Sequence, residues 1–166
     1  MASAFDPAVA FVLAQEGGLS EHSADPGGIT NFGISQRAYP TLDIRALTEE
    51  QARVLYRTDY WDALRCEELP PRLAIAVFDS AVNLGCHRAA ILFQTTLDVS
   101  ADGQIGPATL KAAWHGQETA EIRQIIKEFL ARRAIFYASL PIWPHFGFGW
   151  MLRLFGLYEL TIKMKL

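Results

Sequence analysis

The sequence has little of what marks metal, redox or nucleotide chemistry. It has two cysteines, Cys66 and Cys86, and neither a CxxC pair nor a Cys/His spacing typical of a zinc site. Its four histidines are scattered, and no glycine-rich loop is followed by the Lys-Thr pair of a phosphate-binding loop. We therefore expect no metal and no cofactor. We interpret both cysteines as reduced, partly buried thiols, while a disulfide between them stays open.

An excess of basic residues and a long apolar run are also missing. The chain carries 15 Lys and Arg against 18 Asp and Glu, a net charge of −3. This argues against nucleic acid as a partner, because phosphate binding needs clustered positive charge. No apolar run reaches the roughly 18 residues of a membrane-spanning helix, so stable membrane insertion is not expected. Residues 1–7 lack the basic start of a secretory signal, and we expect synthesis in the cytoplasm.

What the chain does have is the composition and periodicity of a compact helical protein. Hydrophobic residues make up 51% of its 166 residues, enough for one domain with a core. Apolar spacing near 3.6 residues and helix-start signals predict helices that begin near Asp6, Thr48, Pro70, Arg88, Pro107, Ile122 and Trp150, the last of them short and packed on the core. A hairpin is expected within residues 29–35.

The segment from Glu16 to Thr30 carries the strongest chemical signal. Glu16 ends the first apolar helical stretch, and the glycine-rich loop that follows carries a second acid, Asp25, and a hydroxyl, Thr30. Cleavage of a glycosidic bond needs one carboxylic acid to protonate the leaving oxygen and a second group to stabilise the sugar cation or to aim a water. The segment therefore predicts glycosidic chemistry, with an ordinary helix end and surface loop as the alternative.

The order E-G-G-x6-D-P-G-G-x-T in residues 16–30 resembles the signature of the family 108 glycoside hydrolases. The likeness continues through F-D-x-A-V-N-x-G in residues 78–85. The second half resembles the peptidoglycan-binding region associated with that family, through D-G-x-x-G-P-x-T in residues 102–109 and F-G-F-G-W in residues 146–150. Members of this family are phage and prophage endolysins and related secretion muramidases.

The resemblance implies a mainly α, lysozyme-like fold of two lobes, with a small irregular or β-hairpin region after the first helix. Residues 1–97 would form the catalytic lobe. Residues 98–166 would form a helical peptidoglycan-binding-like lobe, packed with the first as one compact domain. The implied activity is that of an N-acetylmuramidase that cleaves the β-1,4 bond between N-acetylmuramic acid and N-acetylglucosamine.

The resemblance also assigns catalytic roles. The glutamate of the family's E-G-G motif maps onto Glu16, as the general acid. The E-x8-D spacing is similar to that of phage lysozymes and makes Asp25 the group that stabilises the transition state. Thr30 lies one residue closer to Asp25 than in the E-x8-D-x5-T pattern of those enzymes. With Asp25, it would position the attacking water.

Three further residues are substrate-binding candidates, each with a structural alternative. Asn83 could hydrogen-bond an N-acetyl group, or it could satisfy backbone groups at a helix end. Gln94 could reach the cleft, or it could be an exposed helical glutamine. Trp61, like its neighbour Tyr60, could stack on a sugar ring, or it could pack in the core. Asp79 is interpreted as a structural hydrogen-bond acceptor among core residues.

Two rival functions stay open. A lytic transglycosylase of the same fold class would need one acid, because a hydroxyl of the sugar itself closes a 1,6-anhydro ring. A non-catalytic peptidoglycan-binding phage module would have no need of Glu16. On the main reading, the partner is bacterial peptidoglycan, the protein is a monomer, and it acts on the wall in the periplasm after release through a holin-type lesion.

Overall fold

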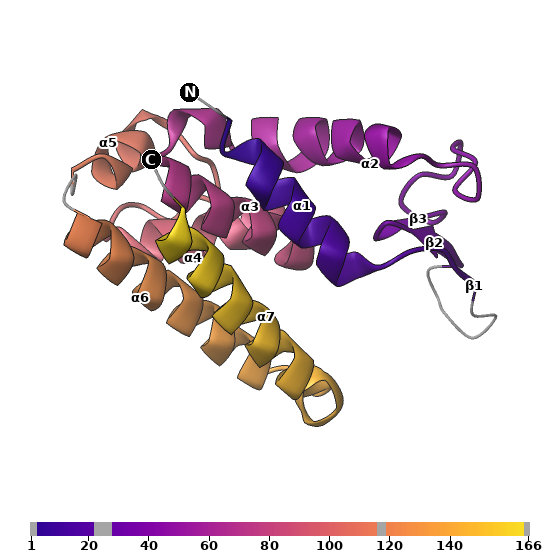
Figure 1. Ribbon diagram of the computed structural model, residues 1–166. Helices are drawn as coiled ribbons and strands as arrows, with labels where there is room; N and C mark the ends of the chain where they lie inside the picture. The colour runs from indigo at the N-terminus through magenta and orange to yellow at the C-terminus, as the bar shows by residue number, and fades with distance from the viewer. Residues whose placement is uncertain (1–2, 22–27, 116–118, 165–166) are drawn as a thin grey trace.

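The computed structural model describes residues 3–21, 28–115 and 119–164, and these form a mainly helical protein with one small sheet (Figure 1). The helices are α1 (Phe5–Glu16), α2 (Glu49–Tyr56), α3 (Pro71–Leu84), α4 (Cys86–Thr96), α5 (Pro107–Ala113), α6 (Thr119–Ala138) and α7 (Trp143–Lys163). A π-helix, Arg57–Asp62, continues α2, and a short 3₁₀ helix covers Cys66–Glu68. The strands are β1 (Ser20–Glu21), β2 (Ile29–Asn31) and β3 (Ile34–Ser35). The predicted class, mainly α with a small β region after the first helix, is confirmed.

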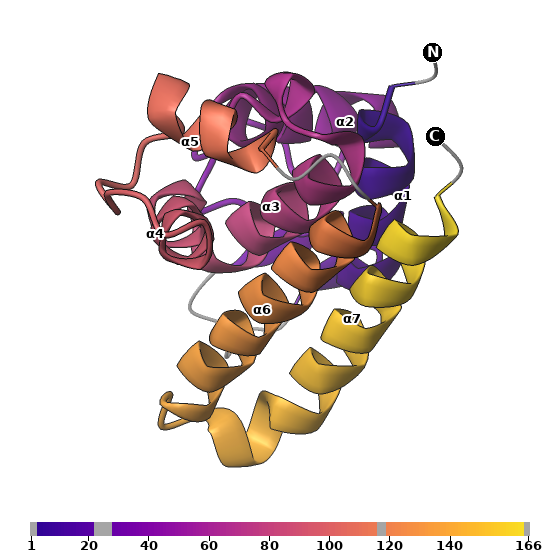
Figure 2. The same cartoon turned by 90° about the vertical axis from the view of Figure 1, so that its left-hand side faces the viewer.

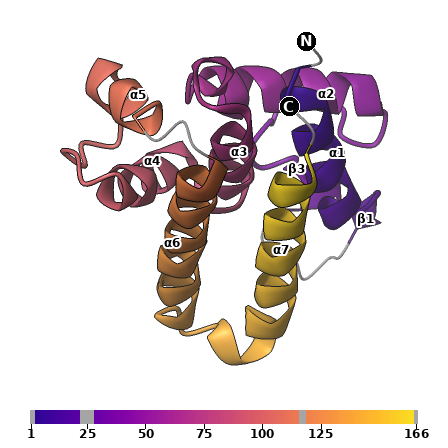
Figure 3. The same ribbon diagram turned by 60° about the vertical axis from the view of Figure 1, so that its left-hand side comes forward.

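Helix α3 is the centre of the molecule. Every residue from Arg72 to Ala81 is buried, and a helix buried all round must be covered on every side. Helices α1, α4, α6 and α7 supply that cover. In Figure 2, α6 and α7 run side by side in front of α3, and Figure 3 shows α1 and the sheet on one side of α3 with α4 and α5 on the other. Elements from both halves of the sequence therefore meet on α3.

Local sequence signals predicted the start of α2 correctly and the start of α1 only approximately. The helix expected near Thr48 begins with a capping box, since Thr48 Oγ1 accepts from the Gln51 amide at 3.2 Å and Gln51 Oε1 accepts from the Thr48 amide at 2.9 Å. The helix expected to begin near Asp6 begins at Phe5 with Ala4 as its N-cap, so Asp6 lies in the first turn and does not cap the helix. Asp6 instead pairs with Arg53 of α2 at 2.6 Å. This surface pair ties α1 to α2.

The last helix is longer than predicted. It spans 21 residues and begins at Trp143 rather than near Trp150. Pro144 lies in the first turn of α7, where its missing N–H leaves no hydrogen bond unmade. Leu154 and Leu157 are buried, as expected for a packed helix. Within the described ranges, no helix is long and apolar enough to cross a bilayer.

The two cysteines are free thiols. Cys66 is buried in the core, and Cys86 is half-buried with its Sγ directed at the carbonyl oxygen of Asp59 at 3.4 Å. The interpretation as reduced, partly buried thiols is confirmed.

The small sheet has the antiparallel order β1-β2-β3. The expected hairpin joins β2 to β3 through Phe32 and Gly33, whose φ values of 51° and 76° are both positive. Such a two-residue turn matches the twist of the strands. Strand β1 was not predicted, because two residues are too few to show a period. The turn carries Gly33 against the end of α1, where the candidate site lies.

Candidate active site

Glu16 is the last residue of α1, as the glycine pair after it predicts. Gly17 has a φ of 75° and ends the helix, while its amide still donates to the carbonyl of Leu13 at 3.3 Å. Positive φ is available to glycine at low cost, so the chain can turn sharply after the acid. The side chain of Glu16 is 25% exposed. The side chain of Glu16 is therefore held by the protein, and part of it remains exposed to solvent.

The carboxyl group of Glu16 lies at a pocket of about 200 Å³. The pocket is formed by the β2–β3 turn, the segment after β3, the α2 region and α3. Besides the acid, its lining contains the hydroxyl groups of one serine and three tyrosines. The lining residues are Glu16, Gly33, Ile34, Ser35, Ala38, Tyr39, Tyr56, Tyr60 and Val82. A pocket with one acid and several hydroxyls suits a polar, uncharged ligand such as a sugar.

The β2–β3 turn packs closely against the side chain of Glu16. The hydroxyl of Tyr56 donates to the carbonyl oxygen of Phe32 at 2.8 Å, which anchors the turn. Gly33 lies so close that a Cβ there would stand 2.7 Å from Cγ of Glu16 and 2.6 Å from the Tyr56 hydroxyl. Only glycine is compatible with this contact, and the contact restricts the stem of Glu16.

The tyrosines of the pocket keep their protons. Burial raises the pKa of Tyr39, Tyr56 and Tyr60 above the ordinary value. Tyr39 donates to the carboxylate of Asp59 at 2.5 Å, and this bond also favours the protonated phenol. The pocket is therefore lined by neutral hydroxyls over a wide pH range, and their oxygens can accept hydrogen bonds from sugar hydroxyls.

Behind the pocket, Glu16 joins a buried charge network, by which we mean Glu16, Arg153, Asp79 and Arg133. Nη1 of Arg153 donates to Glu16 Oε1 at 2.7 Å. The same guanidinium reaches Asp79 Oδ1 through Nε at 2.9 Å and Nη2 at 2.8 Å. Arg133 donates from Nη1 to Asp79 Oδ2 at 2.6 Å. Two positive and two negative groups balance one another, from α1, α3, α6 and α7.

Asp79 is the inner anchor of this network and is 1% exposed. Burial by itself raises the pKa of Asp79, but the guanidinium groups of Arg133 and Arg153 outweigh burial and hold the pKa below its ordinary value. A buried carboxylate needs such partners, because removing a charge from water is costly. The interpretation of Asp79 as a structural acceptor is confirmed.

Of the other two predicted catalytic residues, Thr30 lies within the described residues and Asp25 does not. Thr30 is half-buried in the middle of β2 and lies directly opposite Ser35 of β3. Directly opposed residues share a face of the sheet, and Ser35 lines the Glu16 pocket. Thr30 thus shares a face of the sheet with Ser35, but it is not itself among the residues that line the pocket. Asp25 lies outside the described residues. The roles of all three stay predictions.

Asn83 is connected to the network rather than isolated. Its Oδ1 accepts from the hydroxyl of Tyr137, and Nε of Arg133 donates to that hydroxyl at 2.7 Å. Its neighbour Val82 lines the pocket. With the carbonyl oxygen taken, the amide nitrogen is the group that a contact to a substrate would use, so substrate binding by Asn83 stays a prediction.

The prediction that Trp61 stacks on a sugar ring is wrong. Its side chain is 1% exposed and packs edge-on against Phe5 and Phe78, while its indole N–H donates to Glu67 at 3.1 Å. No ring face is left for a ligand, so the core alternative holds. It is the adjacent Tyr60 that lines the pocket.

Gln94 is also buried, so it is neither a substrate contact in the cleft nor an exposed helical glutamine. It is 1% exposed. Its Nε2 donates to Asp102 Oδ1, the Gln104 carbonyl and Thr109 Oγ1 at 2.7–3.1 Å, and its Oε1 accepts from the Gly103 amide at 2.8 Å. The amide group is fully used in holding the loop that precedes α5, which explains the D-G-x-x-G-P-x-T motif as a folded turn.

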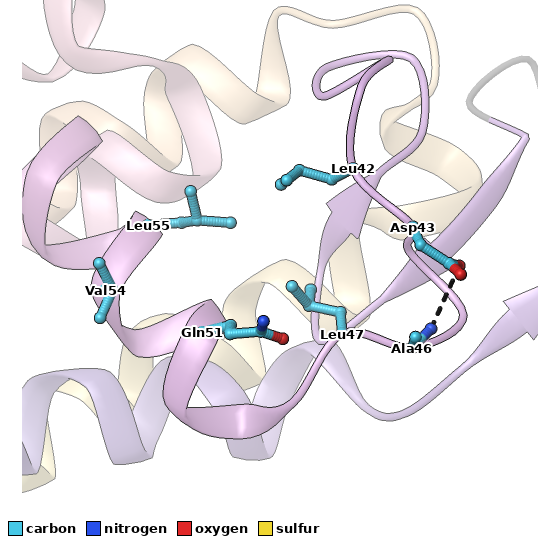
Figure 4. Close-up of a pocket in the computed structure, with 7 residues that line it drawn as sticks. All are labelled: Leu42, Asp43, Ala46, Leu47, Gln51, Val54 and Leu55. Atoms are coloured by element: carbon cyan, nitrogen blue, oxygen red, sulfur yellow. Dashed lines mark hydrogen bonds between the residues drawn. The ribbon is translucent and has the colours of Figure 1, made fainter.

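A second hollow of about 360 Å³ lies between α2 and residues 42–47 (Figure 4). Its lining is mostly apolar, with Leu42 and Leu47 on the loop side and Leu55 on the helix side. Its one carboxylate, Asp43, accepts from the backbone amides of Arg45 and Ala46 at 3.1 and 3.3 Å. Asp43 therefore shapes its own loop, and this hollow does not present an acid for sugar chemistry.

Across the described ranges, no group of three or more His, Cys, Asp or Glu side chains is arranged to hold a metal ion.

The sequence reasoning missed Arg153, Gly33 and Tyr56. Arg153 had a usable signal, since it is a single charge within the apolar run from Trp150 to Phe155, and a lone buried arginine needs an acidic partner. Gly33 and Tyr56 carry no comparable signal, because their role arises from packing between elements far apart in the sequence.

The contact at Gly33 gives a first prediction. Gly33→Ala is expected to cost about 1–2 kcal/mol of stability through its positive φ and to reduce catalysis about tenfold, because the new methyl group displaces Glu16. Gly85→Ala is the matched control, with a φ of 84° and no neighbour within 4 Å of the new Cβ. Urea unfolding should show a stability loss for both variants, and wall-cleavage rates should show an activity loss for Gly33→Ala alone. Equal activities would show that the turn does not position the acid.

The described geometry is that of a glycoside hydrolase of lysozyme-like form: a mainly helical fold, a short sheet, and an acid at a helix end over a hydroxyl-lined pocket. The comparisons agree. The family model for glycosyl hydrolase 108 matches residues 9–85, and a second model, for a predicted peptidoglycan domain, matches residues 88–154. The structure of SagA from Brucella abortus is similar, with a TM-score of 0.84 and 31% identity over 95% of this chain and 93% of that chain. No curated protein matches the sequence significantly.

The chain therefore belongs to the glycosyl hydrolase 108 family, as its motifs indicate, and it is a glycoside hydrolase that acts on peptidoglycan. The two family models adjoin at the junction of α3 and α4. The division between lobes at residues 97 and 98 stays a prediction.

Proposed function

We propose that the protein is an N-acetylmuramidase that hydrolyses the β-1,4 bond between N-acetylmuramic acid and N-acetylglucosamine, with Glu16 as the general acid. One observation carries the proposal: Glu16 is fixed at the end of α1 with 25% of its side chain exposed, at a pocket lined by hydroxyls. Membership of a glycoside hydrolase family with a peptidoglycan domain supports the substrate class.

In the proposed reaction, Glu16 donates its proton to the bridging oxygen as the bond from C1 of N-acetylmuramic acid to that oxygen breaks. Positive charge develops on C1 and the ring oxygen, and Asp25 stabilises it. A water then attacks C1 and passes a proton to the carboxylate of Asp25, which completes the hydrolysis. Thr30, which faces the same side of the sheet as the pocket-lining Ser35, helps to place this water. Attack from the face opposite the leaving group inverts the anomeric centre.

Product analysis tests the reaction directly. Purified peptidoglycan is digested, and the soluble fragments are reduced with borohydride and weighed by mass spectrometry. Hydrolysis at the proposed bond adds one water per cut and leaves reduced N-acetylmuramic acid at the new end. Reduced N-acetylglucosamine at that end would contradict the proposed bond.

The same digest separates the rival functions. A lytic transglycosylase gives 1,6-anhydro ends without added water, since the C6 hydroxyl of the muramic acid attacks C1 in place of water. A non-catalytic binding module gives no fragments at all, although it still sediments with the wall. Either result would overturn the proposal.

The resemblance to endolysins further supports a bacteriolytic role after holin-type release. Turbidity of cells with a permeabilised outer membrane should fall on addition of the purified protein and stay constant with a Glu16→Gln variant. Lysis by both proteins would separate the effect from glycoside hydrolysis.

A further inference from the structure

Arg153 comes from the half of the chain matched by the peptidoglycan domain, yet it contacts the proposed catalytic acid in the other half. It lies on α7, 137 residues from Glu16 in the sequence, and Nη1 is 2.7 Å from Glu16 Oε1. Its Nε and Nη2 face Asp79 Oδ1 of α3. One planar guanidinium thus joins the acid to the central helix, which a single ammonium group cannot do with the same geometry.

The burial of the network decides which member positions which. Asp79 is 1% exposed and the Arg133 side chain 0% exposed, so these two form a fixed inner pair. The Arg153 side chain is 8% exposed and is held by Asp79, whereas Glu16 is the most exposed member at 25%. The buried pair therefore holds Arg153 in place, and Arg153 in turn holds the carboxyl group of Glu16, which lies at the pocket.

The remaining support of Glu16 acts on a different part of the side chain. Gly33 of the β2–β3 turn restricts Cβ and Cγ, but it makes no contact that fixes rotation of the carboxyl group. Arg153 fixes that rotation by engaging Oε1. A general acid is effective only when its proton points at the leaving oxygen, and small misplacements reduce rates steeply.

We propose that Arg153 is a positioning residue for Glu16, so that the peptidoglycan-binding half of the chain completes the catalytic site of the other half. The proposal rests on the proposed role of Glu16 as the general acid. Helix α7 then takes part in catalysis, because its packing on α3 sets the direction of the acid.

A purely structural role, in which Arg153 only neutralises Asp79, is the competing explanation. Arg133 separates the two, because it pairs with the same carboxylate at 2.6 Å and reaches it from the opposite oxygen. Its hydrogen bonds lead to Asp79, Ser80 and Tyr137. Arg133→Met and Arg153→Met therefore remove equivalent charges from Asp79, and only the second removes the partner of Glu16.

The experiment measures kcat and KM on soluble, uncrosslinked glycan strands, with urea unfolding of each variant. Arg153→Met is expected to lower kcat by about 10–100-fold with KM nearly unchanged, because misplacement affects the reacting geometry rather than binding. Arg133→Met is expected to lose comparable stability but to lower kcat less than Arg153→Met does, because it leaves the hydrogen bond from Arg153 to Glu16 in place. Arg153→Lys, which restores a charge without the planar fork, should fall between wild type and Arg153→Met.

Equal kcat values for the two Met variants, after correction for folded fraction, would overturn the proposal. If Arg153→Met does not fold, Arg153→Lys against Arg133→Lys replaces that comparison: a lower kcat for Arg153→Lys supports positioning, and equal values overturn it. Glu16→Gln is measured beside them. An active Glu16→Gln refutes the proposed function, whereas an inactive Glu16→Gln with a fully active Arg153→Met refutes only the positioning role.

Discussion

Replacing Glu16 by Gln is expected to lower the rate of peptidoglycan cleavage by about 10²–10⁴-fold, the range that a lost general acid produces. Gln has nearly the same shape, and its amide oxygen can still accept the hydrogen bond from Arg153 that Glu16 Oε1 accepts at 2.7 Å. It has no acidic proton to deliver to the glycosidic oxygen. The fold should persist, because Arg153 keeps its contacts to Asp79 and a neutral acceptor at position 16.

Asp6→Asn is the matched control for that substitution. Asp6 lies on the same helix, is 65% exposed and pairs with Arg53 at 2.6 Å, so the change also removes one paired carboxylate from α1. Fragment release from purified peptidoglycan should be unchanged in Asp6→Asn and nearly absent in Glu16→Gln. A Glu16→Gln variant within a fewfold of wild type, with unaltered circular dichroism, would mean that another group supplies the proton.

Much of the helical framework could be predicted from local sequence signals, because those signals act within one or two turns. The helix predicted to begin near Thr48 is capped by that residue, and glycine ends α1 at Glu16. The start of α7 was misplaced because a proline can either end a helix or occupy its first turn. In this chain Pro144 occupies the first turn of α7.

The position of Glu16 could also be predicted from the sequence, whereas the residues that contact it could not. A motif placed Glu16 at a helix end before a glycine loop, and the structure has it there. Arg153 reaches it from another helix more than a hundred residues away. Such a contact depends on how α1 and α7 both pack on α3, and no local period in the sequence records that packing.

The two failed substrate-binding predictions share one physical cause. Trp61 and Gln94 carry groups that can contact sugars, but such groups also serve as buried packing and hydrogen-bonding groups. Residue type alone does not separate these uses. Burial does, and Trp61 and Gln94 are each 1% exposed.

Asp79→Ala is expected to lower the free energy of unfolding by about 3–5 kcal/mol, the usual cost of leaving a buried charge without its partner. The substitution leaves Arg133, whose side chain is 0% exposed, without its carboxylate, and it leaves Arg153 with Glu16 alone. Removing Arg133 as well, in Asp79→Ala/Arg133→Met, restores the charge balance. The double variant should therefore be more stable than Asp79→Ala alone, which urea unfolding of both proteins would show.

The pH dependence provides an independent check on the same substitution. The folded-state pKa of Asp79 lies below its ordinary value of 3.8. Its stabilising contribution is consequently complete above that value and is lost as the pH falls further, through the folded-state pKa. The gap in unfolding free energy between wild type and Asp79→Ala should be widest near neutral pH and should narrow in acid below about pH 3.8. A gap that is small at neutral pH, or that does not change in acid, would show that the two arginines do not depend on Asp79 for their burial.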